Sequence, residues 1–298
     1  MKRVLITGAS GFIGQHLLPF LQEKDYEVFP CYHSRKIDFP PCMHPVKANL
    51  LDQEERRALL KEVRPSHLIH LAWYVNPLDY MHSQENLEWM LASIDLFTEF
   101  GRNGGKRCLS VGSCAEYDWS ESILEEEGLL QNETLYACAK NITHHSLEAL
   151  GRFFKFDTLW PRIFWLYGPG ESPKRFIPSL ISTLDRGETF ICKDPDKEID
   201  LMHVKEVAYA LCCALDDESV SGALNIASGH SIRIETIVKE IASLLHCPPG
   251  LVKFEHGDVS PIKIKVSSTK IKKLRGFHYH QKDALKDYVD SIRKDFIV

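Results

Sequence analysis

The chain has 298 residues, 44% of them hydrophobic and 26% charged, which is the composition of an ordinary globular protein. A net charge of −5 and a pI near 6.3 provide no basic field for nucleic acid, and no apolar run reaches the roughly 18 residues of a membrane span. The nine scattered cysteines favour reduced thiols, and the apolar run after Met1 is too short for a signal peptide. These features predict a cytoplasmic protein without nucleic-acid or membrane partners.

The chain opens with a strand expected at residues 3–7, a glycine-rich turn and a helix expected at about 12–24. The order of strand, spaced glycines and helix is typical of a dinucleotide-binding site. The first glycine allows a sharp turn, the second lets a pyrophosphate approach the backbone, and the third lets helix and strand pack closely. Free N–H groups at the helix start would bind the phosphates. The predicted cofactor contacts of this turn are Gly8, Ser10, Gly11, Phe12, Ile13 and Gly14.

Strand-like and helix-like segments alternate through the first 160 residues. Further strands are expected at 27–32, 67–72, 107–112 and 157–163, and further helices at about 52–62, 83–103 and 135–153. Such alternation predicts an α/β fold with a doubly wound parallel sheet of the Rossmann type, in which ligands bind at the carboxyl ends of the strands. Helical spacing at 204–215 and 234–245 predicts two later helices, and Cys212 and Cys213 are expected in the core.

The residues after the second strand bear on the choice of cofactor. An NAD-specific site usually has an acidic side chain there, but this chain has Tyr32, followed by His33, Ser34, Arg35 and a second cation. Because an arginine can bind a 2′-phosphate through paired hydrogen bonds, the segment favours NADP(H), with NAD(H) as the alternative. His33, Ser34 and Arg35 are the predicted contacts. The other interpretation of the two cations is a solvated loop.

Two further stretches lie where a bound dinucleotide would pass. One follows the expected third strand, where residues would lie near the adenine and Asp52 then caps the next helix. The other ends the fourth strand at the pyrophosphate crevice. The predicted cofactor contacts of both stretches are Asn49, Leu50, Leu71, Ala72 and Trp73. Trp73 and Tyr74 begin a loop that could cover a substrate, and ordinary packing of these two aromatic side chains is an equally good interpretation.

A serine, a tyrosine and a lysine form the candidate catalytic set. Ser113 stands at the end of the expected fifth strand, and Tyr136 and Lys140 are four residues apart on one face of the expected helix. A lysine so placed can stabilise a tyrosinate and lower the tyrosine pKa, which makes the phenol a proton donor or acceptor near neutral pH. The serine hydroxyl can orient a substrate oxygen. Catalytic roles are therefore predicted for all three.

With these motifs in place, the sequence resembles the extended short-chain dehydrogenases/reductases, in the branch of nucleotide-sugar epimerases, dehydratases and reductases. The resemblance covers nearly the whole chain. Besides the glycine turn and the catalytic set, it rests on His70 to Ala72, Asn86, Arg162 to Gly170, Asp200 to Val204, Asn225 to Gly229, and Gly257 with Asp258.

The resemblance implies a domain organisation and an assembly. Residues 1–169 plus 198–229 would form the dinucleotide-binding domain, with 198–228 returning to the main sheet. Residues 170–197 plus 230–298 would form a smaller substrate domain. The resemblance also implies a homodimer through the helices around Asn86 and Tyr136.

Residue roles follow from the same resemblance. Tyr136, Lys140, Ile163 and Phe164 would contact the cofactor, the last two at the nicotinamide. The implied substrate contacts are Tyr74, Ser113, Cys114, Ala115, Trp165, Arg175, Phe176, Ile191 and Asp258. Many relatives have diphosphate-binding arginines where this chain has Ile199 and Glu255. The cations that could replace them are Lys174, Arg175, Lys193, Lys197 and Lys253, and Arg175 is the best candidate.

The positions after Ser113 narrow the activity. The 4,6-dehydratases of this branch have an Asp-Glu pair there, whereas this chain has Cys114 and Ala115, which cannot supply that acid and base. A dehydratase is therefore rejected. The segments 113–117 and 161–171 are most similar to reductases of NDP-4-keto-deoxysugars. The sequence thus predicts NADPH-dependent reduction of a keto group, commonly C4, of a nucleotide-linked deoxysugar.

Two other functions stay open. One is an NAD-dependent nucleotide-sugar 4-epimerase that uses the same serine, tyrosine and lysine. The other is a non-catalytic subunit that binds NADP(H) and regulates a partner. His144 and His145, on the helix that carries Tyr136, are interpreted as surface or dimer-interface residues, and no His/Cys set has the spacing of metal ligands.

Overall fold

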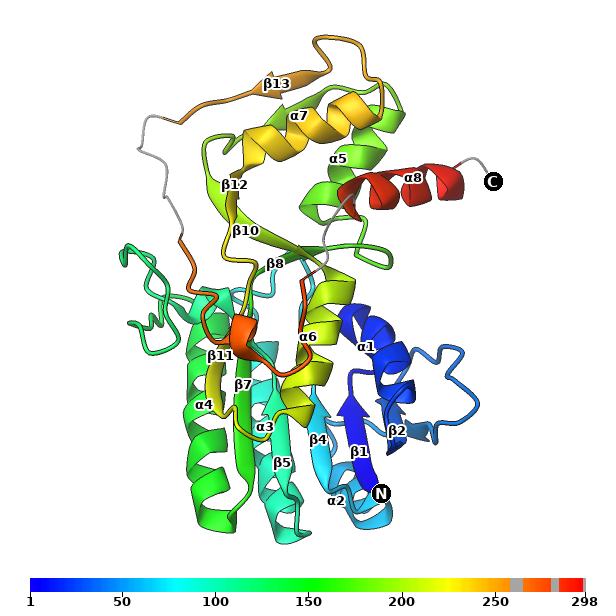
Figure 1. Cartoon of the computed structure of the whole chain (residues 1–298), viewed down its shortest axis with the longest axis vertical. Coiled ribbons are helices and arrows are strands. Elements are labelled where there is room, and N and C mark those ends of the chain that lie inside the picture. Colours follow the sequence, from blue (N-terminus) through cyan, green and yellow to red (C-terminus); the bar gives the residue numbers. More distant parts are fainter. Residues whose placement is uncertain (258–264, 280–283, 297–298) are drawn as a thin grey trace.

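A parallel sheet forms the centre of the fold (Figure 1). The computed structural model describes residues 1–257, 265–279 and 284–296, and within these the sheet has eight strands in the order β11-β7-β5-β4-β1-β2-β3, with β6 paired to β7. The strands are β1 (Lys2–Thr7), β2 (Tyr26–Tyr32), β3 (Val46–Lys47), β4 (His67–His70), β5 (Arg107–Ser110), β6 (Gly112–Ser113), β7 (Asp157–Ile163) and β11 (Gly222–Ile226). The expected doubly wound α/β sheet is confirmed.

Helices cover both faces of this sheet because each central strand is apolar on both sides. Val4 and Ile6 of β1 pack toward α1 (Phe12–Gln22) and α6 (Val204–Asp216), whereas Leu5 between them packs in a second cluster. That second cluster includes side chains of α2 (Gln53–Val63), α3 (Glu85–Arg102) and α4 (Leu135–Phe154). The alternation along one strand therefore separates two cores, as a parallel sheet buried on both faces requires.

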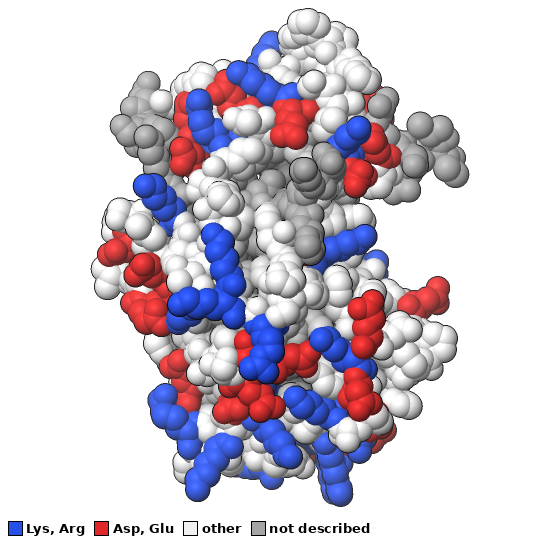
Figure 2. Space-filling view, viewed as in Figure 1, with Lys and Arg blue, Asp and Glu red and all other residues white. Residues whose placement is uncertain are grey.

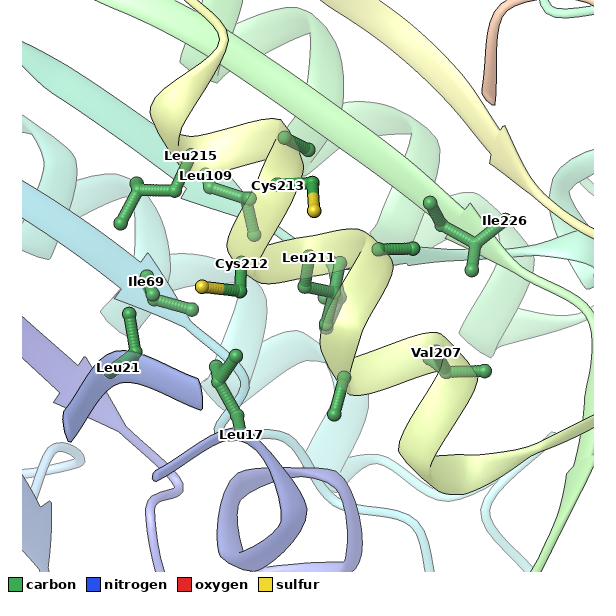
Figure 3. Close-up of a cluster of buried hydrophobic side chains, with 14 of the residues drawn as sticks. Leu17, Leu21, Ile69, Leu109, Val207, Leu211, Cys212, Cys213, Leu215 and Ile226 are labelled. Atoms are coloured by element: carbon green, nitrogen blue, oxygen red, sulfur yellow. The ribbon is translucent and has the colours of Figure 1, made fainter. Parts of the chain in front are cut away.

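Figure 3 shows the core beneath α6, where Leu17 and Leu21 of α1 lie close to α6 and to Ile69 and Leu109 of the sheet. The side chains of Cys212 and Cys213 are almost fully buried in this cluster, as predicted. The adjacent thiols therefore serve as small core side chains.

A second group of elements lies above the carboxyl ends of the main strands in Figure 1. It contains a sheet ordered β12-β10-β8, a pair β13-β9, and three helices packed around one apolar cluster. Its members are β8 (Trp165–Tyr167), α5 (Phe176–Asp185), β9 (Phe190–Cys192), β10 (Glu198–His203), β12 (Ser231–Arg233), α7 (Ile234–Leu244), β13 (Val252–Phe254) and α8 (Ala284–Phe296). Two short 3₁₀ turns complete the described elements, η1 (Cys114–Glu116) and η2 (Ile271–Lys273).

The structure differs from the sequence expectation at two places. The strand expected at 107–112 is broken into β5 and β6, with Val111 between them. Residues 198–228 were expected to return to the main sheet, but β10 pairs with β8 and β12, and only α6 and β11 pack on or join the main sheet. The polypeptide crosses between the two groups at β8 and β10. The division into two domains at 170 and 198 stays a prediction.

The distribution of charged and apolar side chains agrees with what the composition predicts. In the face that Figure 2 shows, acidic and basic side chains are interspersed over the lower part of the molecule. Among the residues that the structure describes, no helix combines the length and apolarity needed to cross a bilayer.

Candidate functional site

The glycine turn joins β1 to α1 in a conformation that larger residues would not fit. Gly8 has φ +70°, and a Cβ there would lie 2.8 Å from the Ala72 nitrogen at the end of β4. A Cβ on Gly14 would overlap the Gly8 carbonyl oxygen, so the first turn of α1 can approach β1 only with glycine at this position. Both glycines therefore have the packing roles expected of a dinucleotide-binding turn.

The start of α1 fits a pyrophosphate. Gly11 caps the helix and donates its N–H to the Gly8 carbonyl oxygen at 2.9 Å, and a Cβ on Gly11 would meet nothing within 4 Å except the Gly8 carbonyl group. Among the described side chains, none caps the N–H groups of this first turn. Unpaired N–H groups at an open helix start are the usual partners of a phosphate. Ser10, Phe12 and Ile13 belong to the same turn, and their contacts with a cofactor stay predictions.

The other predicted cofactor residues lie on loops after the main strands. His33, Ser34 and Arg35 are exposed immediately after β2. Asn49 accepts a hydrogen bond from the Leu51 N–H at 3.1 Å, whereas the Leu50 side chain is buried in the second core cluster and has only its backbone left for a ligand. Asp52 caps α2 by accepting from the Glu55 N–H at 3.0 Å, as predicted.

Leu71 and Ala72 continue from β4 along the glycine turn. The Leu71 N–H donates to the Thr7 carbonyl at 3.2 Å, and the Ala72 N–H points to the Thr7 hydroxyl at 3.5 Å. The Thr7 hydroxyl also bonds His70, whose other ring nitrogen bonds Ser93 of α3. This buried chain of hydrogen bonds fixes the end of β4 against β1.

Ser113, Tyr136 and Lys140 come together as predicted from their spacing. Ser113 ends β6, and Tyr136 is the second residue of α4, whose start is capped by Thr134. The Ser113 hydroxyl lies close enough to the Tyr136 phenol to favour its charged form. Lys140 lies one turn further along α4, is 3% exposed, and donates from Nζ to the Val111 carbonyl at 2.9 Å. The three side chains therefore meet at the carboxyl end of the main sheet.

The electrostatics of this set are dominated by burial. Burial raises the pKa of the Tyr136 phenol, and the Ser113 hydroxyl opposes that rise. Burial lowers the pKa of Lys140 to about 7, and the negative charge of Glu116 opposes that fall. The pKa of Tyr136 is therefore raised and not lowered as the sequence predicts, because burial outweighs the neighbouring lysine. The neutral phenol that this favours is the form that donates a proton to an oxygen.

Glu116 forms a buried network behind Ser113 that the sequence argument missed. Its carboxylate is fully buried and accepts from the Ser113 N–H at 2.6 Å, the Trp160 indole N–H at 2.9 Å and Arg162 Nε at 2.7 Å. Arg162 also donates to the Tyr117 hydroxyl at 3.0 Å. The contact between Glu116 and Ser113 was detectable in the sequence, because Ser-x-x-Glu is the capping-box pattern. Ser113 and Glu116 form such a box around η1.

The loop between β4 and α3 places two aromatic side chains near Tyr136. The Trp73 ring is 6.5 Å from the Tyr136 ring and that of Tyr80 is 5.0 Å from it, both edge-on. The hydroxyl of Tyr74 is exposed and donates a hydrogen bond to the Asp79 carboxylate at 2.8 Å. Arg175, which caps α5, has its guanidinium 5.2 Å from the Tyr80 ring. No sequence signal marks Tyr80, because the loop has no periodic pattern.

The remaining predicted substrate residues are spread over several elements. Cys114 and Ala115 follow Ser113 in η1, and burial raises the pKa of the Cys114 thiol to about 12. Ile163 and Phe164 are buried at the end of β7, and Trp165 packs on Trp119 with the ring centroids 5.6 Å apart. Phe176 begins α5, Ile191 is 48% exposed on β9, and Asp258 lies outside the described residues.

The cations that could replace the two absent arginines differ in exposure and in their contacts with aromatic rings. Ile199 is buried in the core of the upper group, and Glu255 is exposed. Lys174, Lys193 and Lys253 are exposed as well. Lys197 is partly buried, with Nζ 5.6 Å from the Trp165 ring, and Arg175 lies against Tyr80.

The surface interpretation of His144 is wrong. His144 is 5% exposed and stacks on Trp160 with ring centroids 5.0 Å apart, and burial lowers its pKa to about 3. His144 faces β7, where its ring contacts Trp160 and Arg162, whereas His145 is exposed. Among the described residues, no three His, Cys, Asp or Glu side chains group as metal ligands.

Comparisons with known proteins identify the family and the fold. The sequence profile of the NAD dependent epimerase/dehydratase family matches residues 4–227. A dTDP-4-dehydro-6-deoxyglucose reductase from Escherichia coli is 24% identical over 253 residues, which cover 80% of each chain. A GDP-L-colitose synthase from Yersinia pseudotuberculosis is 24% identical over 269 residues, which cover 82% of each. The fold is similar to that of a UDP-N-acetylglucosamine 4-epimerase from Methanobrevibacter ruminantium M1 in complex with UDP-N-acetylmuramic acid, with a TM-score of 0.86, 21% identity and 99% of both chains covered.

Proposed function

Because the chain belongs to the NAD dependent epimerase/dehydratase family, we propose that it reduces a keto group, at C4, of a nucleotide-linked deoxysugar with NADPH. The observation that carries this proposal is that Ser113, Tyr136 and Lys140 meet at the carboxyl end of the main sheet, with Cys114 and Ala115 directly after the serine. The name of the reductase gives a nucleotide-linked 4-dehydro-6-deoxy sugar as its substrate, and the name of the synthase gives a GDP-linked sugar as its product.

Each residue has a defined part in such a reduction. Tyr136 donates its phenolic proton to the oxygen as that atom gains negative charge. Ser113 hydrogen-bonds the same oxygen and holds it beside the phenol. Lys140 contributes a positive charge close to Tyr136, which stabilises the tyrosinate left behind. The nicotinamide ring, when bound, supplies the hydride.

The choice of reduction over other reactions of the family rests on local chemistry. A dehydratase needs an acid and a base beside the catalytic oxygen, and Cys114 and Ala115 supply neither near neutral pH. An NAD-dependent 4-epimerase would use the same three residues, so it is the alternative. A regulatory subunit would need no assembled proton donor, and the Ser113–Tyr136 pair argues against it.

The substrate diphosphate would bind Arg175. This cation starts α5 and reaches Tyr80, whose ring in turn contacts Tyr136. A guanidinium with a flat aromatic partner keeps its hydrogen-bond donors free for phosphate oxygens. Lys197 is a second candidate for binding the diphosphate. It lies beside Trp165, which directly follows Ile163 and Phe164, the two residues expected at the nicotinamide.

We expect NADPH to bind as a dissociable cofactor and more tightly than NADH, because Arg35 can pair with the 2′-phosphate. Calorimetry on the wild type and on Arg35→Ala should show NADPH affinity lower in the variant by about 10- to 100-fold, with NADH affinity little changed. A panel of NDP-4-keto-6-deoxysugars then identifies the substrate by loss of NADPH absorbance.

The matched control is Lys36→Ala, in which an adjacent exposed cation is removed. Tightly held NAD(H) that accompanies the purified protein and is insensitive to Arg35→Ala would instead favour the epimerase. NADPH binding without turnover of any keto-sugar in the panel would favour the regulatory subunit.

We also propose a homodimer through α3 and α4, which pack side by side. Their outer surface exposes large apolar side chains at Leu87, Leu91, Ile142 and Phe153. Leu87 and Leu91 are one turn apart, so both point from the same face of α3. A second copy of the chain would cover this apolar surface.

Leu91→Glu should therefore convert a dimer into a monomer of 34.1 kDa in sedimentation velocity at micromolar protein, because it buries a charge at the pairing surface. Leu91 is 63% exposed in the single chain, so folding should not suffer. Leu129→Glu, at a similar exposure of 60% outside both helices, is the control and should leave the mass unchanged. A monomeric wild type would refute the homodimer.

A further inference from the structure

The Lys140 ammonium lies against the face of the Trp73 ring. Nζ is 3.7 Å from the ring centroid, and the Tyr136 and Trp160 rings are each 5.9 Å away. One N–H of the ammonium is used by the Val111 carbonyl. A cation this close to an indole face is attracted by the negative face of the ring, and the attraction is larger where water is excluded.

Trp73 is itself held in a fixed orientation. Its indole N–H donates to the Asn86 side-chain oxygen at 2.9 Å, and Asn86 is fully buried at the start of α3. The Asn86 amide donates to the Tyr80 carbonyl at 2.6 Å and to the Ser83 carbonyl at 2.9 Å. The ring therefore cannot leave Lys140 without breaking a partly buried hydrogen bond to Asn86, which also holds the loop through the Tyr80 and Ser83 carbonyls.

The surroundings of Lys140 offer it little other stabilisation as a cation. The titratable groups that face it are Glu116 from η1, His70 from β4 and Tyr136 on its own helix. Burial keeps His70 neutral, with its pKa lowered to about 3, and Tyr136 is neutral too. Among the described residues, no carboxylate forms a salt bridge with Lys140, and Glu116 is engaged by Arg162. The indole face and one carbonyl are its direct partners.

We propose that Trp73 is a positioning residue that acts through Lys140, keeping its ammonium charged and in place beside Tyr136. This role rests on the proposed function, since Lys140 serves proton transfer only if Tyr136 is the donor. It assigns a task to a residue that sequence reasoning placed only along the cofactor or in ordinary packing. It also explains why a loop residue of this size is bonded to a buried asparagine.

A purely structural Trp73 would have the opposite electrostatic effect. If the ring only excluded water, its removal would hydrate Lys140 and raise the lysine pKa toward its ordinary value. If the ring stabilises the ammonium, replacing it with an apolar side chain that still excludes water lowers the pKa further, because only the charged form gains from the ring. The sign of the shift therefore separates the two roles.

The test is a titration of Lys140 by NMR in the cofactor-free, full-length protein labelled in its lysine side chains, with the signal assigned by its loss in Lys140→Arg. In Trp73→Leu we expect the Lys140 pKa to fall by up to about one unit, and in Trp73→Phe by less, since phenylalanine is the weaker partner. Trp89→Leu, which removes another partly buried tryptophan of the adjoining helix, should leave it unchanged. An unchanged or raised pKa in Trp73→Leu overturns the assignment.

Fluorinated tryptophan keeps the test independent of folding. Successive fluorines withdraw charge from the ring face without altering its shape, so the Lys140 pKa should fall stepwise in labelled wild type and stay constant in labelled Trp73→Leu. A constant pKa in the wild type also overturns the assignment. Failure of the proposed function is seen separately. In that case the Lys140 pKa shifts with the expected sign, but the protein reduces no keto-sugar. Where turnover is found, the alkaline limb of kcat/KM should move with the Lys140 pKa.

Discussion

Tyr136→Phe should lower the turnover of a keto-sugar by ~10²–10⁴-fold while NADPH binding is retained, because the change removes only the proton donor. The phenol is buried and hydrogen-bonded to Ser113, and burial raises its pKa, so it holds its proton until a developing alkoxide takes it. Phenylalanine keeps the ring contacts with Trp73 and Tyr80. Steady-state kinetics with each cofactor, together with calorimetry of NADPH, measure the two effects separately.

A matched control is Tyr26→Phe, because Tyr26 starts β2 at the opposite end of the main sheet and its buried hydroxyl has no hydrogen-bond partner in the described structure. This variant should keep full turnover. Unchanged turnover in Tyr136→Phe would remove the phenol from the mechanism. Loss of NADPH affinity in that variant would show instead that the hydroxyl is needed for binding.

The parts of this fold that were predictable from sequence depend on residues that are close together in the chain. The Gly8, Gly11 and Gly14 turn, the Asp52 cap and the pairing of Tyr136 with Lys140 each depend on residues within a few positions of one another. Apolar runs gave the main strands because both faces of a central parallel strand are buried. Such features need no knowledge of the distant chain.

The contacts that escaped prediction join residues far apart in sequence. Glu116 and Arg162 are 46 positions apart, and both are charged, which normally indicates a solvated surface. Trp73 meets Lys140 only because β4 ends and α4 begins at the same edge of the sheet. His144 was assigned to the surface for the same reason, since its burial depends on Trp160 and Arg162 of β7. Pattern alone does not reveal partners that the fold supplies.

The Glu116–Arg162 pair leads to the largest expected effect on stability. Both side chains are almost completely buried, at 0% and 1% exposure, and the guanidinium also serves Tyr117 and the Glu126 carbonyl. Arg162→Met should lower the free energy of unfolding by about 3–5 kcal/mol, because it leaves an unpaired carboxylate in the core. Urea unfolding followed by circular dichroism measures the change. Arg186→Met, which breaks an exposed pair with Glu188, should have no comparable effect.

A second substitution distinguishes an unpaired charge from simple loss of packing. In Glu116→Gln with Arg162→Met the buried charge is gone, so the double variant should be more stable than Arg162→Met alone. Recovery should be incomplete, since a glutamine has one acceptor oxygen for the Ser113 and Trp160 N–H groups that the carboxylate now serves with two. Losses that simply add in the double variant would mean that the two side chains stabilise the fold independently. In the coupled case, Ser113 should also lose its fixed backbone position, so turnover should fall in the double variant even where the fold recovers.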